Sequence, residues 1–191
     1  SLVVDLAVQV SEIGIKFNEN DFANRLFGSE GTSFYIAKEG VLLDISISDM
    51  EENFDVILGN NQNDSIRVNS TRNVYIGGGD GNDLLEGGSG NDWLSGDAGN
   101  DQLYAGKGND ILFVDADDVI DGGDGYDKAW VSTETGVTID LAATHLETVV
   151  GNNGEDNLTY TGTEGILLAG EGGNDRLVTG SGSDLLSGGA G

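Results

Sequence analysis

The sequence predicts an all-β solenoid, in which short strands and tight turns stack coil upon coil. The main observation is a nine-residue unit that occurs four times without interruption from Gly78 to Phe113, as GGDGNDLLE, GGSGNDWLS, GDAGNDQLY and AGKGNDILF. Every copy has glycine in the fourth place, asparagine in the fifth, aspartate in the sixth and leucine in the eighth. The chain also has 32 glycines and no proline, which suits a backbone that turns sharply yet keeps its N–H donors.

Each unit divides into a turn followed by a strand. The first six places are rich in residues that tolerate positive φ and favour tight turns. Places seven to nine alternate, so the eighth-place leucine points inward. A strand of about three residues is not stable alone and must stack on neighbours about 4.8 Å away. We therefore expect two units per coil, with left-handed turn geometry at the fifth-place asparagines Asn82, Asn91, Asn100 and Asn109.

The chain is strongly acidic, with 34 Asp and Glu against 8 Lys and Arg and a formal charge of −26. This charge repels nucleic acid and anionic membrane surfaces, and attracts cations. Between Gly78 and Phe113 only seven of 36 residues are Leu, Ile, Val or Phe, close to the composition of disordered chains. Apolar burial cannot readily offset both the entropy of ordering so many glycines and the repulsion between the acids. We therefore expect cations between the rows of aspartates.

The stacked turns provide ligands for such cations. Asp83 and Asp101 are 18 residues and one coil apart, as are Asp92 and Asp110, so each pair should lie close together. Carbonyl groups of the glycine turns supply further oxygen atoms. A flexible shell of carboxylate and carbonyl oxygens suits Ca²⁺ better than Mg²⁺. The sequence thus predicts that the aspartate is a ligand, the glycines make room and the leucine forms the core.

These four units resemble the RTX (repeats-in-toxin) family, also called haemolysin-type calcium-binding repeats. The resemblance implies a right-handed parallel β-roll that holds several Ca²⁺ ions between successive turns. The candidate metal ligands are Asp64, Gly78, Asp80, Gly81, Asp83, Gly87, Gly90, Asp92, Gly96, Ala98, Gly99, Asp101, Gly106, Gly108, Asp110, Asp118, Gly123, Gly125, Asp127, Asp156, Gly173, Asp175 and Asp184. Of these, Asp80 lies off the pattern, as do Asp97 and Asp124, and solvated charge is the simpler interpretation for all three.

The pattern continues imperfectly on both sides of the four units. Upstream, GNNQNDSIR from Gly59 offers Asp64 and Ile66, and VNSTRNVYI from Val68 is expected to place Tyr75 inward and Asn73 at the aspartate place, with Gly77 as an extra residue. Downstream, VDADDVID from Val114 is one residue short and offers Asp118 and Ile120, and GGDGYDKAW from Gly122 offers Asp127 and Ala129.

A second array follows, in which GNNGEDNLT, GEGGNDRLV and TGSGSDLLS supply Asp156, Asp175 and Asp184. An offset of 92 residues relates the two arrays, because Gly59, Asp64, Gly81, Asp83, Asp92 and Ser95 correspond to Gly151, Asp156, Gly173, Asp175, Asp184 and Ser187. We expect a β-rich flanking or capping segment over 1–58, a first β-roll block over 59–130, a short flanking segment over 131–150 and a second block over 151–191.

Alternating β-branched runs in residues 1–58 indicate strands, namely VVDLAVQV, IGIKF, SFYIA and VLLDISIS. DMEENF, from Asp49 to Phe54, is a candidate helical turn. This segment can cap the first edge of the roll or form a small recognition domain. We favour the cap, because the shorter lead-in before Gly151 resembles the same device.

Two further features bear on function. Trp93, Ile111, Phe113 and Trp130 should form an outward aromatic stripe. An exposed stripe of this kind can mark a partner surface, but we favour the alternative that residues 131–150 fold back and cover it. His145 is the single histidine, and we interpret it as a surface or packing residue. No G-x-S-x-G or H-E-x-x-H motif is present, so we expect no catalytic activity here.

The sequence as a whole predicts a calcium-binding module that folds on binding extracellular Ca²⁺. There is no cysteine, and neither a signal peptide nor a transmembrane segment is evident. The final GGAG resembles the start of another unit, which is typical of a fragment. Resemblance to the family implies type I secretion of a parent toxin, adhesin or enzyme, in which the module is a folding driver and spacer. The alternative is a recognition module that binds a receptor or glycan through the flank or the aromatic stripe.

Overall fold

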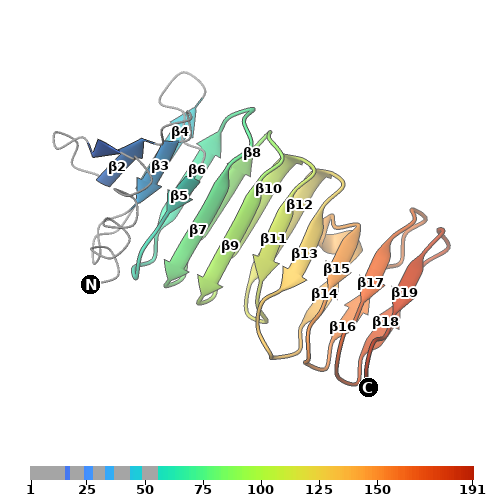
Figure 1. Ribbon diagram of the computed structural model, residues 1–191. Coiled ribbons are helices and arrows are strands. Elements are labelled where there is room, and N and C mark those ends of the chain that lie inside the picture. Colours follow the sequence, from blue (N-terminus) through green and yellow to red (C-terminus); the bar gives the residue numbers. More distant parts are fainter. Residues whose placement is uncertain (1–15, 18–23, 28–32, 37–43, 49–55) are drawn as a thin grey trace.

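The structure is a computed structural model that describes residues 16–17, 24–27, 33–36, 44–48 and 56–191. It confirms the expected all-β solenoid, because parallel strands are stacked in two layers and the chain passes from one layer to the other in each coil (Figure 1). The colours of the ribbon follow one another along the stack in sequence order. Residues next to each other across a sheet are therefore about one coil apart in the sequence.

The odd-numbered strands form one layer, an 11-stranded sheet in the order β1-β2-β3-β5-β7-β9-β11-β13-β15-β17-β19. Its members are β1 (Lys16–Phe17), β2 (Asn24–Phe27), β3 (Ser33–Ile36), β5 (Val56–Leu58), β7 (Tyr75–Asp80), β9 (Trp93–Ala98), β11 (Ile111–Val114), β13 (Lys128–Val131), β15 (Thr148–Val150), β17 (Leu167–Ala169) and β19 (Leu185–Ser187). All its pairings are parallel except β1 with β2 and β2 with β3.

The even-numbered strands form the opposite layer in two parts. The 5-stranded sheet contains β4 (Asp44–Ser48), β6 (Ser65–Asn69), β8 (Leu84–Gly88), β10 (Gln102–Gly108) and β12 (Val119–Gly125). The 3-stranded sheet contains β14 (Thr138–Asp140), β16 (Asn157–Thr159) and β18 (Arg176–Val178). A short helix, α2 (Leu141–Thr144), follows β14 and contacts β12.

The eighth-place residues define the register of both layers. Leu94 pairs with Ile76 on one side and Leu112 on the other. In the opposite layer Leu85 pairs with Ile66 and Leu103. Because side chains alternate across a strand, one aligned residue fixes the inward or outward direction of the whole unit. Two units per coil and an inward eighth place are thus confirmed.

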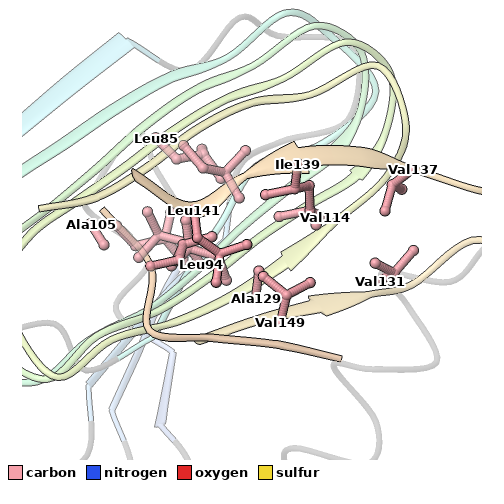
Figure 2. Packing of buried hydrophobic residues seen from close by; sticks show 14 of the residues in the cluster. Leu85, Leu94, Ala105, Val114, Ala129, Val131, Val137, Ile139, Leu141 and Val149 are labelled. Carbon is pink, nitrogen blue, oxygen red and sulfur yellow. The ribbon is translucent and has the colours of Figure 1, made fainter. Parts of the chain in front are cut away.

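The core lies between the two layers and consists mainly of these eighth-place side chains (Figure 2). Leu85, Leu94, Leu103 and Leu112 are each 0% exposed. The imperfect units contribute in the same way, through the fully buried side chains of Ile57, Ile66, Ile76, Ala129, Val149, Leu158 and Leu168. Leu141, the first residue of α2, is also buried in this core.

One sequence-based assignment of the frame is wrong. Ile76, and not Tyr75, occupies the inward eighth place and pairs with Leu94. Tyr75 lies in the outward row and pairs with Trp93. The aspartate place is consequently taken by the buried Val74 instead of Asn73, because the backbone N–H of Val74 donates to Asp92 Oδ1. The extra residue therefore precedes this unit, and Gly77 is its ordinary ninth residue.

Residues 131–150 do not fold back over the aromatic stripe but form the next coil. β14 pairs with β16, and β15 pairs with both β13 and β17. Trp93 and Trp130 each remain 49% exposed, and Phe113 contacts both indoles at ring-centroid distances of 6.1 and 6.2 Å. The aromatic stripe (Trp93, Ile111, Phe113 and Trp130) is thus an open part of the outer face of the odd-numbered sheet.

Parts of the N-terminal segment extend both layers. β1, β3 and β4 lie within runs expected to be strands, whereas β2 was not expected. β3 pairs in parallel with β5, and β4 with β6. The run VVDLAVQV and the turn DMEENF lie outside the described residues, and the domain boundaries drawn from the sequence stay predictions. Within the described part of the chain, no helix has the length and hydropathy to cross a membrane.

Candidate calcium sites

Two columns of sixth-place aspartates run along the solenoid, one on each edge. Asp83 N donates to Asp101 Oδ1 at 2.7 Å, and Asp92 N donates to Asp110 Oδ1 at 2.7 Å. The expected proximity of these pairs is therefore confirmed. Further bonds of the same kind run from Asp64 N to Asp83, from Asp110 N to Asp127 and from Asp156 N to Asp175. In every case the side chain accepts from the coil before its own.

The second oxygen of these carboxylates is buried and has no hydrogen-bond partner. This holds for Oδ2 of Asp83, Asp92, Asp101, Asp110, Asp127, Asp156 and Asp175. Buried polar atoms in native proteins almost always have partners, so an unpartnered one points to a water or ion. All seven unpartnered oxygens belong to the sixth-place aspartate of a unit. The unpartnered oxygen is therefore a regular feature of the repeat and not a local defect.

The unpartnered oxygen lies beside a main-chain carbonyl of the next coil. At Gly87, in the first place of its unit, an added methyl carbon would lie 2.7 Å from Asp92 Oδ2 and 2.6 Å from the carbonyl oxygen of Ala105. The corresponding groups meet at Gly78, where Asp83 Oδ2 and the carbonyl oxygen of Gly96 flank the missing side chain. We call this arrangement of a first-place glycine, a carboxylate oxygen and a next-coil carbonyl the glycine cradle.

Fourth-place glycines allow the turns of neighbouring coils to pack closely. Gly99 has φ of 150° and Gly81 has φ of 132°. A side chain on Gly99 would collide with the carbonyl group of Gly81, one coil before. Only glycine combines this backbone conformation with such a close approach. These residues shape the turns through their backbone.

The fifth-place asparagines do not adopt left-handed geometry, so that expectation is wrong. The only non-glycine residues with positive φ among the described residues are Asp97, His145 and Glu171. Instead, the asparagines form a second ladder in the opposite sense, in which each side chain accepts from the coil after its own. Asn100 N donates to Asn82 Oδ1 at 3.0 Å, and Asn109 N donates to Asn91 Oδ1 at 2.7 Å. The asparagines therefore join neighbouring turns, as sequence spacing alone did not predict.

Burial disfavours the charged form of the sixth-place aspartates in both columns. It raises the pKa of Asp92 to about 7, with a smaller rise from the neighbouring Asp110, against the bond from Val74 N. Burial likewise raises the pKa of Asp101 to about 7, and the pKa of Asp83 and Asp127 to about 6. A bound cation has the opposite effect to burial, because an opposite charge at short range favours the charged carboxylate.

Not every predicted ligand has the same environment. Asp64 Oδ2 accepts from Asn60 N at 2.8 Å. Both oxygens of Asp118 accept backbone N–H groups, from Asp101 and Asp115, in the shortened unit. Asp184 Oδ1 accepts from Ile166 N at 3.2 Å. Asp80 is exposed at the end of β7, in keeping with solvated charge. Whether each candidate binds an ion stays a prediction.

Sequence reasoning missed several members of the cradles. Gly59, Gly122, Gly151 and Gly170 occupy first places beside the carboxylates of Asp64, Asp127, Asp156 and Asp175. The nine-residue frame contains the signal for these glycines. The roles of His145 and Glu147, described below, follow from no repeat pattern.

Asp97 occupies the second place of its unit, which is glycine in the other three of the four uninterrupted units. It has φ of 67°, whereas Gly79, Gly88, Gly106 and Gly123 stand at the same second place with φ between 96 and 115°. Since a left-handed conformation strains a non-glycine residue by roughly 1–2 kcal/mol, we expect Asp97→Gly to raise the unfolding free energy by about 1 kcal/mol after the entropy of glycine is counted. Urea unfolding of the calcium-loaded protein measures this change.

A matched variant, Asp97→Asn, separates backbone strain from charge, because asparagine keeps the side-chain volume and removes the negative charge. If the asparagine variant gave the whole gain, charge repulsion and not φ would be the cause. A loss of stability with glycine in the calcium-loaded protein would contradict the prediction and indicate that the contacts of the Asp97 carboxylate, among them the 2.8 Å hydrogen bond from Ser95 Oγ, outweigh the backbone strain.

The residues present fit a calcium ion. The cradles offer carboxylate and carbonyl oxygens, which hard cations prefer, and neighbouring turns can share one ion. Within residues 56–191 and the described strands before them, no group of three or more His, Cys, Asp or Glu side chains gathers as a metal site. The prediction that main-chain carbonyls contribute to each shell is consistent with this arrangement.

Comparison with known proteins agrees with this chemistry. The family model for the RTX calcium-binding nonapeptide repeat matches four copies, within residues 77–112 and 161–191. The comparisons with curated proteins and with solved structures gave no match.

Proposed function

Because the chain carries RTX calcium-binding nonapeptide repeats in a parallel β-solenoid, we propose that it folds on binding extracellular Ca²⁺. In this proposal it acts as folding driver and structural spacer of a type I secreted toxin, adhesin or enzyme. The observation that carries the proposal is the set of seven buried aspartate oxygens without partners. These oxygens make the ion-free fold unfavourable and the calcium-bound fold favourable.

The coupling follows from the electrostatics of the columns. Without cations, seven carboxylates must be buried either with an unpaired charge or with a bound proton, and both states oppose folding at neutral pH. The cradles bring their carboxylate and carbonyl oxygens together only when successive coils are stacked. Calcium then binds the folded state and not the unfolded one, so its binding free energy adds to stability.

This switch matches the difference in calcium between cell interior and exterior. Sites of extracellular modules have dissociation constants on the order of 10⁻⁴ to 10⁻³ M, so they fill at millimolar calcium and stay empty at the low concentrations of a cytoplasm. An unfolded chain of charge −26 is extended by its own repulsion, and such a chain suits passage through a secretion channel.

The test is a titration of Ca²⁺ into chelator-treated protein, followed by far-UV circular dichroism, with Mg²⁺ as control. We expect a cooperative transition from coil to β structure with calcium alone. An ion-free protein that is already fully folded, and that melts at the same temperature after calcium is added, would overturn the proposal.

The open aromatic stripe favours a second candidate function, recognition of a receptor or glycan. Trp93 and Trp130 are half exposed and linked through Phe113, and exposed aromatic clusters are typical of binding surfaces. Tryptophan fluorescence of the calcium-loaded protein against a panel of soluble glycans tests it. A response that Trp93→Ala abolishes would support recognition, and silence across the panel would count against it.

A further inference from the structure

The last regular unit of the first array, Gly122 to Trp130, faces a coil that contains no repeat. In the other complete cradles, the carbonyl comes from the first-place residue of a following unit, such as Gly96, Ala105 or Gly170. After Gly122 the corresponding coil is formed by β14, α2 and β15. A solenoid that held ions only between repeats would therefore leave Asp127 with half a site.

The structure nevertheless contains a complete cradle at this position. An added methyl carbon at Gly122 would lie 2.8 Å from Asp127 Oδ2 and 2.5 Å from the carbonyl oxygen of His145. The corresponding values at Gly87 are 2.7 and 2.6 Å, with the carbonyl of Ala105. The carbonyl of His145 thus stands where a repeat unit would put that of its first residue.

Helix α2 brings this carbonyl into position. Asp140 caps the N-terminus of the helix by accepting from Ala142 N, and His145 ends it in a left-handed conformation with φ of 50° and ψ of 50°. Leu141 anchors the helix in the core, and Leu146 N donates to its carbonyl oxygen at 3.1 Å. The His145 ring is fixed by a 2.8 Å contact between its Nδ1 and Asp121 Oδ1. A capped helical turn therefore replaces the glycine turn.

The carboxylate column also continues through this coil. Asp127 N donates to Glu147 Oε2 at 2.7 Å, so glutamate takes the place of the next aspartate. Thr148 N in turn donates to the carbonyl oxygen of Asp127 at 3.1 Å. In a repeat, the sixth-place carboxylate comes five residues after the first-place carbonyl. Here Glu147 comes only two residues after His145, and its longer side chain accepts the hydrogen bond that an aspartate accepts in a repeat.

We propose that residues 141–147 complete a calcium site with the last unit of the first array, through Asp127 Oδ2 and the main-chain carbonyl of His145, and that this seam site joins the two arrays into one folding unit. The proposal rests on the proposed function, since it requires that the chain binds calcium. It assigns a ligand to a segment outside the residues that the repeat family matches, 77–112 and 161–191.

An independent observation supports a ligand at the seam. Asp127 is 0% exposed, and its Oδ2 has no hydrogen-bond partner. The atom points at the cradle, beside a carbonyl oxygen that Gly122 leaves accessible. A carboxylate oxygen without a hydrogen-bond partner and a main-chain carbonyl oxygen next to the same glycine are the kinds of ligand that calcium prefers. The carboxylates of Asp121 and Glu147 add negative charge around the same point.

The two tryptophans allow the seam to be observed separately from the arrays. Trp130 lies on β13 and pairs with Val150 of β15, directly across the seam, whereas Trp93 lies within the first array. In a Trp93→Phe background, Trp130 fluorescence reports the seam, while far-UV circular dichroism reports the whole solenoid. Calcium stoichiometry by isothermal titration calorimetry completes the measurement.

Two variants remove the site in different ways. Asp127→Asn keeps the Oδ1 acceptor for Asp110 N and removes the charged second oxygen, so we expect it to fold. Gly122→Ala keeps the carboxylate and fills the cradle, and the φ of Gly122 is not among the positive ones. Asp117→Asn is the control, because it removes one charge from an exposed residue of a nearby turn.

In the parent protein we expect the Trp130 signal and the circular dichroism to change together over one range of calcium. Both seam variants should bind one calcium ion fewer, and their calcium-induced folding should split into two transitions, with Trp130 following the later one. The control should behave like the parent. Unchanged stoichiometry with coincident transitions in both seam variants would overturn the proposal.

The outcome also separates this inference from the proposed function. If calcium induced no folding in any variant, coupled folding would fail. The ion count would then decide the seam site alone. In that case a parent protein that bound one more ion than both seam variants would support the site, and equal counts would reject it.

Discussion

Gly87→Ala is expected to eliminate calcium binding at the cradle of Asp92 and to destabilise the calcium-loaded protein. The new methyl carbon would lie 2.7 Å from Asp92 Oδ2 and 2.6 Å from the carbonyl oxygen of Ala105, so it would displace the two oxygens that we propose as calcium ligands. Loss of one site removes about 2.7 kcal/mol of unfolding free energy when free calcium is one hundred times the dissociation constant. Because this φ is not positive, the cause is the filled cradle and not a strained backbone.

Gly188→Ala is the matched control, because Gly188 also occupies a first place but an added methyl carbon there meets nothing within 4 Å. Removing glycine from an unconstrained position is neutral or stabilises by roughly 0.4–1 kcal/mol through the unfolded state. Urea unfolding at several calcium concentrations should give a gap between the two variants that widens with calcium. A gap that is independent of calcium would show that packing alone, and not ion binding, explains the glycine.

The ion-free protein is expected to become more stable as the pH falls from 7.5 to about 5. The buried Asp83, Asp92, Asp101 and Asp127 have folded pKa values of about 6 to 7, against an ordinary value of 3.8. Between about pH 4 and 7 the folded chain therefore binds more protons than the unfolded chain. Stability then falls as pH rises through this window. Calcium affinity should change in the opposite direction, because protonated carboxylates bind calcium poorly.

Thermal melting in chelator across this pH range measures the effect, and a pair of single-charge variants separates it from general repulsion. Asp92→Asn removes a fully buried carboxyl group, and Asp80→Asn removes an exposed one. Each variant replaces a single carboxyl group by an amide of the same size. The buried variant should flatten the pH dependence markedly, and the exposed one should hardly change it. An ion-free stability that increases towards pH 7.5 would contradict the assignment of the buried carboxyls.

The sequence was sufficient for the features that repeat. Leu94 and Asp92 recur as Leu112 and Asp110 in the next coil, so stacking brings like residues together and one regular unit predicts the contacts of the others. The cradles could be anticipated only in part, because the free orientation of Asp92 Oδ2 depends on the backbone of the next coil. Composition indicated a cation, and the geometry supplied the carbonyl that faces it.

Prediction failed where a small insertion could be placed in more than one way. Both Tyr75 and Ile76 are large and apolar, so alternation alone did not decide which of them points inward. The hydrogen bond from Val74 N to Asp92 Oδ1 does decide it, because it fixes the sixth place by the partner coil. The register of a solenoid depends on the contacts between two neighbouring coils. It therefore cannot be predicted from the sequence of a single degenerate unit.

Prediction also failed for roles performed by the backbone. His145 lies on the surface, as expected, but sequence reasoning did not foresee that its carbonyl oxygen lies at the cradle of Asp127. The asparagines were assigned to left-handed turns from their propensity, yet their contribution is a hydrogen bond to the following coil. Propensity describes a residue by itself, and these contacts exist only between stacked coils.

The two ladders allow the length of the solenoid to change during evolution in steps of one coil. Each regular coil accepts bonds from the coil before through aspartate and from the coil after through asparagine, so the boundaries between regular coils have the same pair of complementary surfaces. Gain or loss of the eighteen codons for Gly87 to Tyr104 would lengthen or shorten the stack by one coil, about 4.8 Å, and create no new kind of interface. Unequal recombination between near-identical repeats can therefore adjust the reach of the molecule without a search for new sequences.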